Sequence, residues 1–322
     1  MIRRRHLLFT AVLSIAPRAW SADAAWPTRP VRIVAAGAGG VPDQRARWLA
    51  DRLSRVLGQP VIVENLSGAG GVIGAERVAR SAPDGYTLLL LHQGTAAVNP
   101  HIYRHMGYDP LTDFAPITRF GQGPLLMAVP ASLQYRSVGD VIKQAKSRPG
   151  ELTYGSPGIG TPPHLASELL KHLAGIEATH VPFRGGGQLA TALLGGQVTW
   201  SIEGVSVQMG YVNSGHLRAL AITSAKRSAA MPNLPTMAEA GVPGYEFLGW
   251  TGVAAPAATP KRIIDRLYAD IARIGATEEA RAWFASLGSE AGIQSPEEFT
   301  AFIRAEHAKF GTLIREAGIK AE

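Results

Sequence analysis

"VRIVAAGAGGVPDQRARWLADRL", residues Val31–Leu53, begins as an apolar run, breaks into glycines and resumes with apolar residues at helical spacing. This order predicts a strand, a glycine turn and a helix. Backbone N–H groups and the positive end of the helix dipole point into such a turn, so the turn suits an anion. A nucleotide phosphate and a substrate carboxylate would both fit there.

The rest of the chain repeats this alternation of short strands and helices. The 322 residues, 46% of them hydrophobic, suffice for one large or two medium α/β domains. The pattern indicates mostly parallel sheets with crossover helices. Strands are expected at 31–37, 60–65, 86–91, 124–130, 152–157, 179–183, 198–204 and 217–224, and helices at 43–57, 137–147, 162–173, 188–194, 261–274 and 296–314.

The N-terminal segment has the three parts of an export signal. Arginines stand at positions 3–5, an apolar run covers 7–16, and Ala22 and Ala24 are spaced for signal peptidase. We therefore expect residues 1–24 to be cleaved and the mature protein to lie in the periplasm, with an amphipathic helix as the alternative. Arg4 and Arg5 are also compatible with the twin-arginine route.

Composition argues against several classes of protein. The net charge is +7 and spread without blocks, which is poor evidence for binding nucleic acid. The chain has no cysteine, so disulfides and thiolate metal sites are excluded. The histidines show no metal-binding spacing, and we expect neither a metal nor a cofactor.

Four glycine or proline loops stand where strands give way to helices, at 37–42, 65–76, 154–170 and 181–197. In open α/β sheets ligands bind at the carboxyl ends of the strands, so these loops are the expected site, although each alone could be a plain turn.

Two enzymatic interpretations fit poorly. For a dinucleotide site, Gly37, Gly39 and Glu64 are suitably placed, but Pro42 occupies the position of the third glycine. For a serine hydrolase, no serine in these loops follows a glycine at the spacing of a nucleophile elbow. We therefore expect the protein not to be an enzyme.

Phrases in several of these loops resemble a known family. They include "GAGGVIGAE" (68–76), "APDGYTLLL" (82–90), "LTYGSPGIGTPPHLASELL" (152–170) and "THVPFRGGGQLATALLGGQV" (179–198). In these phrases and their order the chain resembles the Bug family of extracytoplasmic solute-binding proteins of tripartite tricarboxylate transporters. The resemblance implies a two-domain type II periplasmic-binding-protein fold that closes on a small organic acid and delivers it to membrane permease subunits. A ligand-sensing subunit with the same fold is the alternative, and we expect a monomer.

The implied domains are discontinuous along the chain. Glycine- and proline-rich crossings at 120–124 and 247–260 separate a first domain, formed by 25–123 and 248–322, from a second domain at 124–247. Two strands would cross between the domains, with the ligand cleft beside them.

The resemblance also implies where the ligand is held. In this family backbone N–H groups of the first strand-to-helix loop and of the second domain's glycine loop hold a ligand carboxylate. The positions carried over to this chain are Gly39, Gly40, Val41, Asp43, His92, Thr95, Ser156, Gly158, Gly160, Thr161, His164, Arg184 and Glu203.

Some of these positions depart from the family pattern. Val41 and Pro42 replace small hydroxyl residues, Pro157 and Pro163 stand where serine is common, and Glu203 begins a Glu-Gly pair in place of Asp-Asn. Such loops offer fewer polar partners, so we expect an acid less polar than citrate. His164 either touches the ligand or only supports the start of its helix, and Arg184 either binds the distal end or is solvated.

Overall fold

Residues 26–228 and 230–316 are described by this structure, which is a computed structural model. The predicted export segment at 1–24 lies outside the described residues. The strands are β1 (Val31–Ala35), β2 (Val61–Asn65), β3 (Thr87–His92), β4 (Phe114–Pro130), β5 (Thr153–Ser156), β6 (Thr179–Pro182), β7 (Trp200–Gly204), β8 (Leu217–Ile222) and β9 (Leu248–Pro256). The helices are α1 (Val41–Leu57), α2 (Val72–Ala79), α3 (Asn99–Ile102), α4 (Val138–Ser147), α5 (Pro162–Ala174), α6 (Gly186–Leu194), α7 (Val205–Asn213), α8 (Lys261–Gly275), α9 (Glu278–Ser286) and α10 (Pro296–Glu316).

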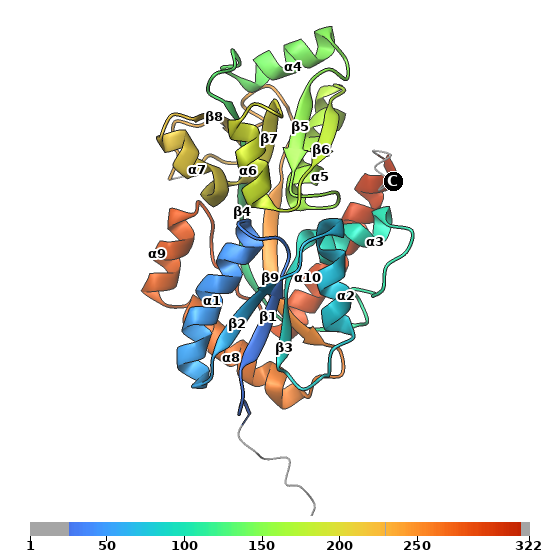
Figure 1. The fold of residues 1–322 in the computed structure, drawn as a ribbon, viewed down its shortest axis with the longest axis vertical. Coiled ribbons are helices and arrows are strands. Elements are labelled where there is room, and N and C mark those ends of the chain that lie inside the picture. Colours follow the sequence, from blue (N-terminus) through green and yellow to red (C-terminus); the bar gives the residue numbers. More distant parts are fainter. Residues whose placement is uncertain (1–25, 229, 317–322) are drawn as a thin grey trace, which may run out of the picture.

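The strands form one sheet that serves two lobes. Its order is β2-β1-β3-β9-β4-β7-β5-β6, with β8 paired to β4. In Figure 1 the first lobe, below, holds β1 to β3 with α1, α2, α8 and α9 around them, and the second lobe, above, holds β5 to β8 with α4 to α7. Pairing is parallel among β1, β2 and β3 and among β5, β6 and β7, as expected. Every pair that involves β4 or β9 is antiparallel, so the sheet is mixed.

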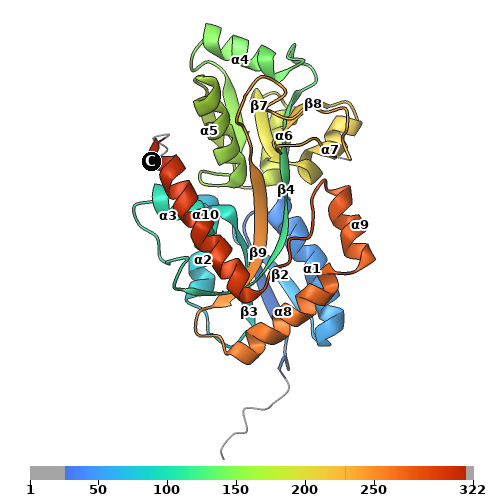
Figure 2. The ribbon, with the colours of Figure 1, turned by 180° about the vertical axis from the view of Figure 1, so that it is seen from behind.

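Strands β4 and β9 connect the lobes. Strand β4 pairs with β9 from Phe114 to Pro124 and then with β7 and β8 from Leu125 to Pro130. The change of partner falls at Pro124, which has no N–H to give to a ladder. Figure 2 shows both strands running from one lobe into the other.

Separate cores fill the lobes. In the first lobe, Trp48 and Leu49 of α1 and Leu267 of α8 pack on the inner strands. In the second, Tyr154 and Trp200 lie in a core that also takes in side chains of α3 and α10. The end of α10 therefore packs against the second lobe while its beginning packs on the first.

Several elements were not expected from the sequence. Expected strands are present, and the two strands expected to cross between the domains near 120–124 and 247–260 are β4 and β9. Helices α2, α3, α7 and α9 were missed, and α6 begins two residues before the predicted position. Valines in "VSVQMGYVN" of α7 favour a strand by propensity, and tertiary packing overrides them here. The domain boundaries at 123/124 and 247/248 stay predictions.

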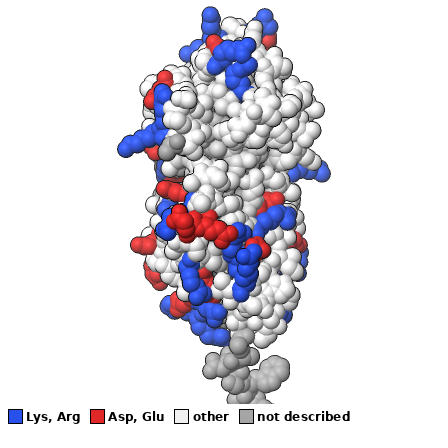
Figure 3. Space-filling model, turned by 90° about the vertical axis from the view of Figure 1, so that its left-hand side faces the viewer, with Lys and Arg blue, Asp and Glu red and all other residues white. Residues whose placement is uncertain are grey.

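Charges on the surface alternate in sign. Figure 3 views the side on which α1 and α9 lie, and charged side chains gather there over the first lobe, with acidic and basic groups interleaved. Arg55 of α1 pairs with Asp51 at 2.7 Å, and Arg52 pairs with Glu279 of α9. This face does not resemble a uniformly basic surface for nucleic acid. Within the described ranges, none of the helices combines the length and hydropathy that crossing a membrane requires.

Candidate functional site

A pocket lies between the lobes, at the carboxyl ends of parallel strands from both. Its cavity of about 100 Å³ fits a small solute and not a nucleotide. The lining comes from the loops after β1, β2, β5, β6 and α9, from the ends of β3 and β7, from the middle of β4 and the start of β9, and from the first turns of α1, α5, α6 and α7. The residues are Ala36, Gly37, Gly40, Val41, Pro42, Arg45, Ser67, Gly68, Gly70, Gly71, His92, Gly123, Pro124, Leu125, Pro157, Thr161, Pro162, Pro163, Arg184, Gly185, Gly186, Glu203, Gly204, Val205, Ser206, Gly249, Trp250, Thr251, Leu287 and Ser289.

Several helices begin at this pocket without a side-chain cap, and four of them are α1, α5, α6 and α7. The N-caps of α1, α5, α6 and α7 are Gly40, Thr161, Gly185 and Gly204, and no side chain in the described part of the chain caps any of the four. Helices α4 and α9, which begin elsewhere, are capped by serine and threonine hydroxyls. Uncapped helix N-termini leave N–H groups and positive dipole ends free for an anion.

Prolines divide these four helices into two kinds. Proline stands at the second position of α1 and at the first two positions of α5, where it removes N–H donors. The first turns of α6 and α7 contain no proline and keep all their donors. The second lobe therefore supplies most of the free backbone donors of the pocket.

Arg45 of α1 is a buried cation in the wall of the pocket. Its Nη1 donates to the Gly121 carbonyl oxygen at 3.0 Å and to Thr251 Oγ1 at 3.0 Å, while its Nε has no partner among the described residues. Burial lowers the pKa of this guanidinium to about 10, so it stays charged at neutral pH. No acidic side chain in the described ranges pairs with it. A buried charge without a counter-charge is costly, and a bound anion would offset that cost.

His92, at the end of β3, adds a neutral donor. Its Nδ1 accepts a hydrogen bond from the Gly94 N–H at 3.1 Å, which places the ring proton on Nε2. That Nε2 is buried beside Gly71 and has no partner among the described residues. Burial lowers the pKa of His92 to about 4, so the ring is neutral at neutral pH and offers one N–H to the pocket.

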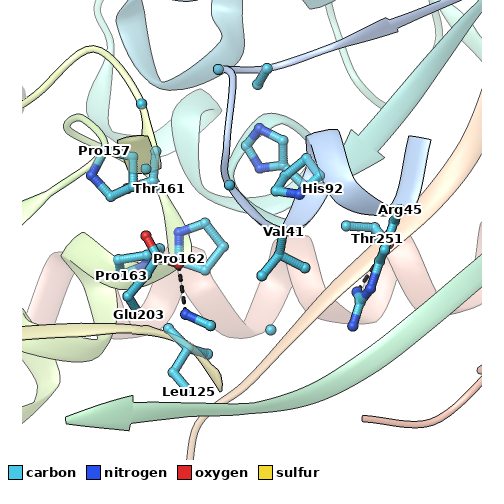
Figure 4. Close-up of a pocket in the computed structure, with 18 of the residues that line it drawn as sticks. Val41, Arg45, His92, Leu125, Pro157, Thr161, Pro162, Pro163, Glu203 and Thr251 are labelled. Atoms are coloured by element: carbon cyan, nitrogen blue, oxygen red, sulfur yellow. Dashed lines mark hydrogen bonds between the residues drawn. The ribbon is translucent and has the colours of Figure 1, made fainter. Parts of the chain in front are cut away.

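Glu203, at the end of β7, is the one acidic residue that lines the pocket in the described part of the chain. It is 4% exposed. Its Oε1 accepts a hydrogen bond from the Gly204 N–H at 2.6 Å, and its Oε2 has no partner among the described residues. Burial raises the pKa of Glu203 to about 7, against the opposing effect of the Gly204 hydrogen bond. Figure 4 shows Glu203 and Arg45 on opposite sides of the pocket, with Val41 between them.

The structure brings about half of the predicted site residues to the pocket. Those that line it are Gly40, Val41, His92, Thr161, Arg184 and Glu203. Those that lie outside its lining are Gly39, Asp43, Thr95, Ser156, Gly158, Gly160 and His164. This second group supports the loops that do line it.

In the first loop the support comes from Asp43. Its carboxylate accepts hydrogen bonds from the Gly39 N–H at 3.0 Å and from Asn65 Nδ2 at 2.9 Å, and it pairs with Arg47 at 2.9 Å. Asp43 therefore holds the loop and has little capacity left for a ligand. Thr95 acts similarly on His92, because its hydroxyl donates to the His92 carbonyl oxygen at 3.0 Å.

The loop after β5 is held from behind in the same way. Ser156 Oγ lies 2.7 Å from His180 Nε2, and His164 Nδ1 accepts from the Gly160 N–H at 3.3 Å. The Thr161 hydroxyl, expected at the ligand, instead donates to the Gly158 carbonyl oxygen at 2.7 Å. His164 thus supports the start of its helix, the second of the two roles considered for it.

Sequence reasoning missed Arg45 and the residues from β4, β9 and the loop after α9. A signal for Arg45 was available, because it lies on the helix face of Ala46, Leu49 and Leu53, which is otherwise apolar and buried. A lone arginine in such a stripe needs a partner. Trp250 and Leu287 carried no comparable signal.

Glycine loops of the two lobes touch across the pocket at two places. The first glycine contact joins 37–40 to 185–187: a methyl group built on Gly186 would lie 3.1 Å from the Gly40 Cα. The second joins 68–71 to 158–160, where a side chain at Gly70 would overlap the Ile159 carbonyl oxygen. The backbones meet so closely that the lobes are closed over the pocket.

Comparisons with known proteins give one consistent answer. A family model described as the tripartite tricarboxylate transporter family receptor matches residues 45–319. The BugT protein of Bordetella pertussis is 38% identical over 315 residues, which cover 97% of this chain and 96% of that protein. A protein from the tcbD-tcbE intergenic region of a Pseudomonas species is 35% identical over 323 residues, or 99% of this chain and 96% of that protein.

Solved structures agree over the same length. An R. palustris protein with adipate superimposes with a TM-score of 0.89 at 39% identity, covering 92% of this chain and 99% of that chain. The periplasmic binding protein BugD gives 0.87 at 32% identity, with 92% and 100% covered. MatC from Rhodopseudomonas palustris, with bound malate, gives 0.85 at 29% identity, with 90% and 100% covered.

The first glycine contact leads to a test of closure. Gly186→Ala should hold the lobes apart, because its methyl group would crowd the Gly40 backbone and overpacking of this kind costs about 1–3 kcal/mol. The chain has no cysteine, so spin labels can be attached at Arg55→Cys on α1 and Lys143→Cys on α4. Double electron–electron resonance should then show a longer distance between the two spin labels than in the labelled protein without the Gly186 substitution.

Gly187→Ala is the matched control. It lies in the same first turn of α6, but a methyl group there would meet nothing closer than the Ala38 carbonyl oxygen at 4.0 Å. Both substitutions give the same gain in helix propensity. Equal label distances in the two variants would contradict a closure set by the first glycine contact.

Glu203 leads to a test of pH dependence. Its pKa is raised from 4.5 to about 7 in the folded protein, so the folded state keeps a proton that the unfolded chain has lost. The wild type should therefore lose stability as the pH rises from about 4.5 to about 7. Relative to it, Glu203→Gln should gain on the order of 3 kcal/mol in free energy of unfolding over that window.

Urea unfolding of both proteins at about pH 5 and pH 8 measures this difference. Glu151→Gln, at an exposed carboxylate of the same lobe, serves as the control and should show no such gain. The variant and the wild type could instead differ in stability by the same amount at both pH values. That result would show that the pKa of Glu203 is not raised in the folded protein.

Proposed function

The chain belongs to the tripartite tricarboxylate transporter receptor family, whose members are solute-binding receptors, and we propose that its own solute is a small organic acid bound between the lobes through a carboxylate. Bug proteins are among its relatives in sequence and in structure.

The observation that carries the proposal is the unpaired charge of Arg45. Its guanidinium is buried in the pocket wall without an acidic partner in the described residues, and its Nε has no hydrogen-bond partner there. A solute carboxylate would neutralise it and accept a charge-assisted hydrogen bond. The neutral N–H of His92 and the free helix N-termini provide further donors.

Size and polarity narrow the choice of acid. Between Arg45 and Glu203 the walls include Val41, Leu125 and Val205, which offer no hydrogen bonds to a solute's middle. A solute with charges along its length, such as citrate, would leave some of them unpaired. The similar R. palustris protein was solved with adipate and MatC with malate, and both ligands are acids with two carboxylates.

The family and the sequence together support a proposal for where the protein acts and which partner it serves. We propose that residues 1–24 direct export and are removed, that the mature protein acts as a monomer in the periplasm, and that it passes its solute to membrane permease subunits. The domains at 25–123 with 248–322 and at 124–247 would be the bodies that close. The protein would act without cofactor or catalysis.

Arg45→Met should weaken the binding of adipate about 10- to 100-fold, because one charge-assisted hydrogen bond is lost. The fold should be kept or stabilised, since a buried unpaired charge is replaced by an apolar side chain of similar length. Titration calorimetry with adipate and hexanoate measures the affinity, and thermal unfolding measures the fold. Arg55→Met, at the exposed end of α1, is the control and should change neither. An unchanged affinity of Arg45→Met for both acids would contradict the assignment.

Intact-mass measurement on protein from the periplasm tests the export proposal. The mass should correspond to a chain that begins near Ala25, because the basic, apolar and small-residue regions precede that position in order. A periplasmic protein that retains Met1 to Trp20 would contradict it.

A further inference from the structure

We infer that Glu203 binds the far end of the solute as a protonated carboxyl group, so that the receptor takes up one proton together with each dicarboxylate. This inference rests on the proposed function, because it assumes that Arg45 holds the first carboxylate. It adds a role for the opposite wall of the same pocket.

The geometry of Glu203 leaves one oxygen for the solute. Strand β7 places the side chain at the pocket, opposite Leu126 of β4, and Oε1 is occupied as the acceptor of the Gly204 N–H. Glu203 lines the cavity, and its buried Oε2 has no partner in the described residues. A proton on this carboxyl group therefore belongs on Oε2, where it makes an O–H donor that only a bound solute can use.

The surroundings of Glu203 favour the protonated form. The ionisable groups on the elements that pack against β7 are Arg119 on β4, Tyr154 on β5, His164, Glu168, Lys171 and His172 on α5, and Tyr211 on α7, and Arg45, His92 and Arg184 line the same pocket. None of these forms an ion pair with Glu203 in the described part of the chain, and Glu168 is paired with Lys171 at 2.7 Å. Burial is the cause that raises the pKa of Glu203, and no charged neighbour contributes.

A second solute carboxylate beside Glu203 would strengthen this preference. Two carboxylates at hydrogen-bond distance in a buried site cannot both be ionised at low cost, so they share one proton. The proton comes from solvent and stays on Oε2, and the hydrogen bond runs from Oε2–H to the solute oxygen. A solute that ends in a methyl group has no acceptor for this bond.

The class of solute follows from the two sides of the pocket, which hold Arg45 and Glu203. One end must be an anion for Arg45, and the other must be an acceptor oxygen for Glu203, with an apolar segment between them. Short dicarboxylic acids meet all three requirements. Adipate and hexanoate are matched probes, because they share a six-carbon chain and differ only in the second carboxylate.

Proton uptake on binding tests the inference directly. Titration calorimetry at about pH 8 in Tris and in HEPES gives the number of protons bound per solute, because the two buffers release protons with different heats. For the wild type, adipate should take up close to one proton and hexanoate none. From about pH 7 to pH 9 the affinity for adipate should fall up to about tenfold per pH unit. His92 and Arg45 have pKa values of about 4 and about 10, so neither changes its charge over most of this range.

Glu203→Gln separates the role of the proton from that of the side chain. The amide keeps the shape, one acceptor for the Gly204 N–H and one donor for the solute, but it cannot titrate. Adipate should still bind to this variant, with no proton uptake and with an affinity that is independent of pH. Glu151→Gln, an exposed carboxylate of the same lobe, should behave as the wild type.

The possible failures are distinguishable. If the wild type binds adipate without taking up a proton, or if Glu203→Gln retains the uptake, the inference is overturned and the proposed function stands. If the wild type binds hexanoate and rejects adipate, the inference is also overturned. If neither acid binds, the proposed function fails and the inference fails with it.

Discussion

The antiparallel ladder between β4 and β9 is the interaction on which the rest of the molecule depends. It is shared by both lobes, since β4 passes from β9 to β7 and β8 at Pro124 and Leu125. Because the ladder holds the two groups of parallel strands end to end within one sheet, the carboxyl end of β1 faces those of β5 and β7. The helices that follow these strands therefore begin at the same place, and their free N-termini gather around one pocket.

The electrostatics of that pocket are incomplete in the protein alone. Arg45, His92 and Glu203 each hold a buried atom without a partner in the described residues, whereas loop residues such as Asp43 are fully bonded. Polar atoms buried without partners cost stability, and folded proteins keep few of them. These three residues line one small cavity, where a solute would complete the set, whereas other buried atoms without partners among the described residues, such as Trp26 Nε1 and Thr259 Oγ1, belong to residues outside its lining. The supporting residues are satisfied because their task is to hold backbone in place.

The sequence predicted the architecture better than the chemistry. Glycine loops after apolar strands located the edge of the sheet where solutes bind, because local rules govern both. His92 and Glu203 were expected at the site through family resemblance, and the structure places both in the pocket wall. Arg45 was missed because its neighbours on the helix are apolar, and its exposure to the cavity depends on β9 and the loop after α9, far away in the chain. Asp43 and Ser156 were assigned to the ligand because a sequence does not show which polar groups are already bonded to their own loop.

The two glycine contacts also bear on how this pocket can change over evolution. Where backbone meets backbone most closely, as at Gly186 and Gly70, a side chain cannot be added on one loop without moving the other, so a change there needs a compensating substitution. Val41, Leu125, Val205 and Leu287 are under no such coupling, because each lines the cavity with a side chain that can be exchanged singly. New solute preferences should therefore arise through single substitutions at these four side chains, while the glycines that bring the lobes together persist unchanged.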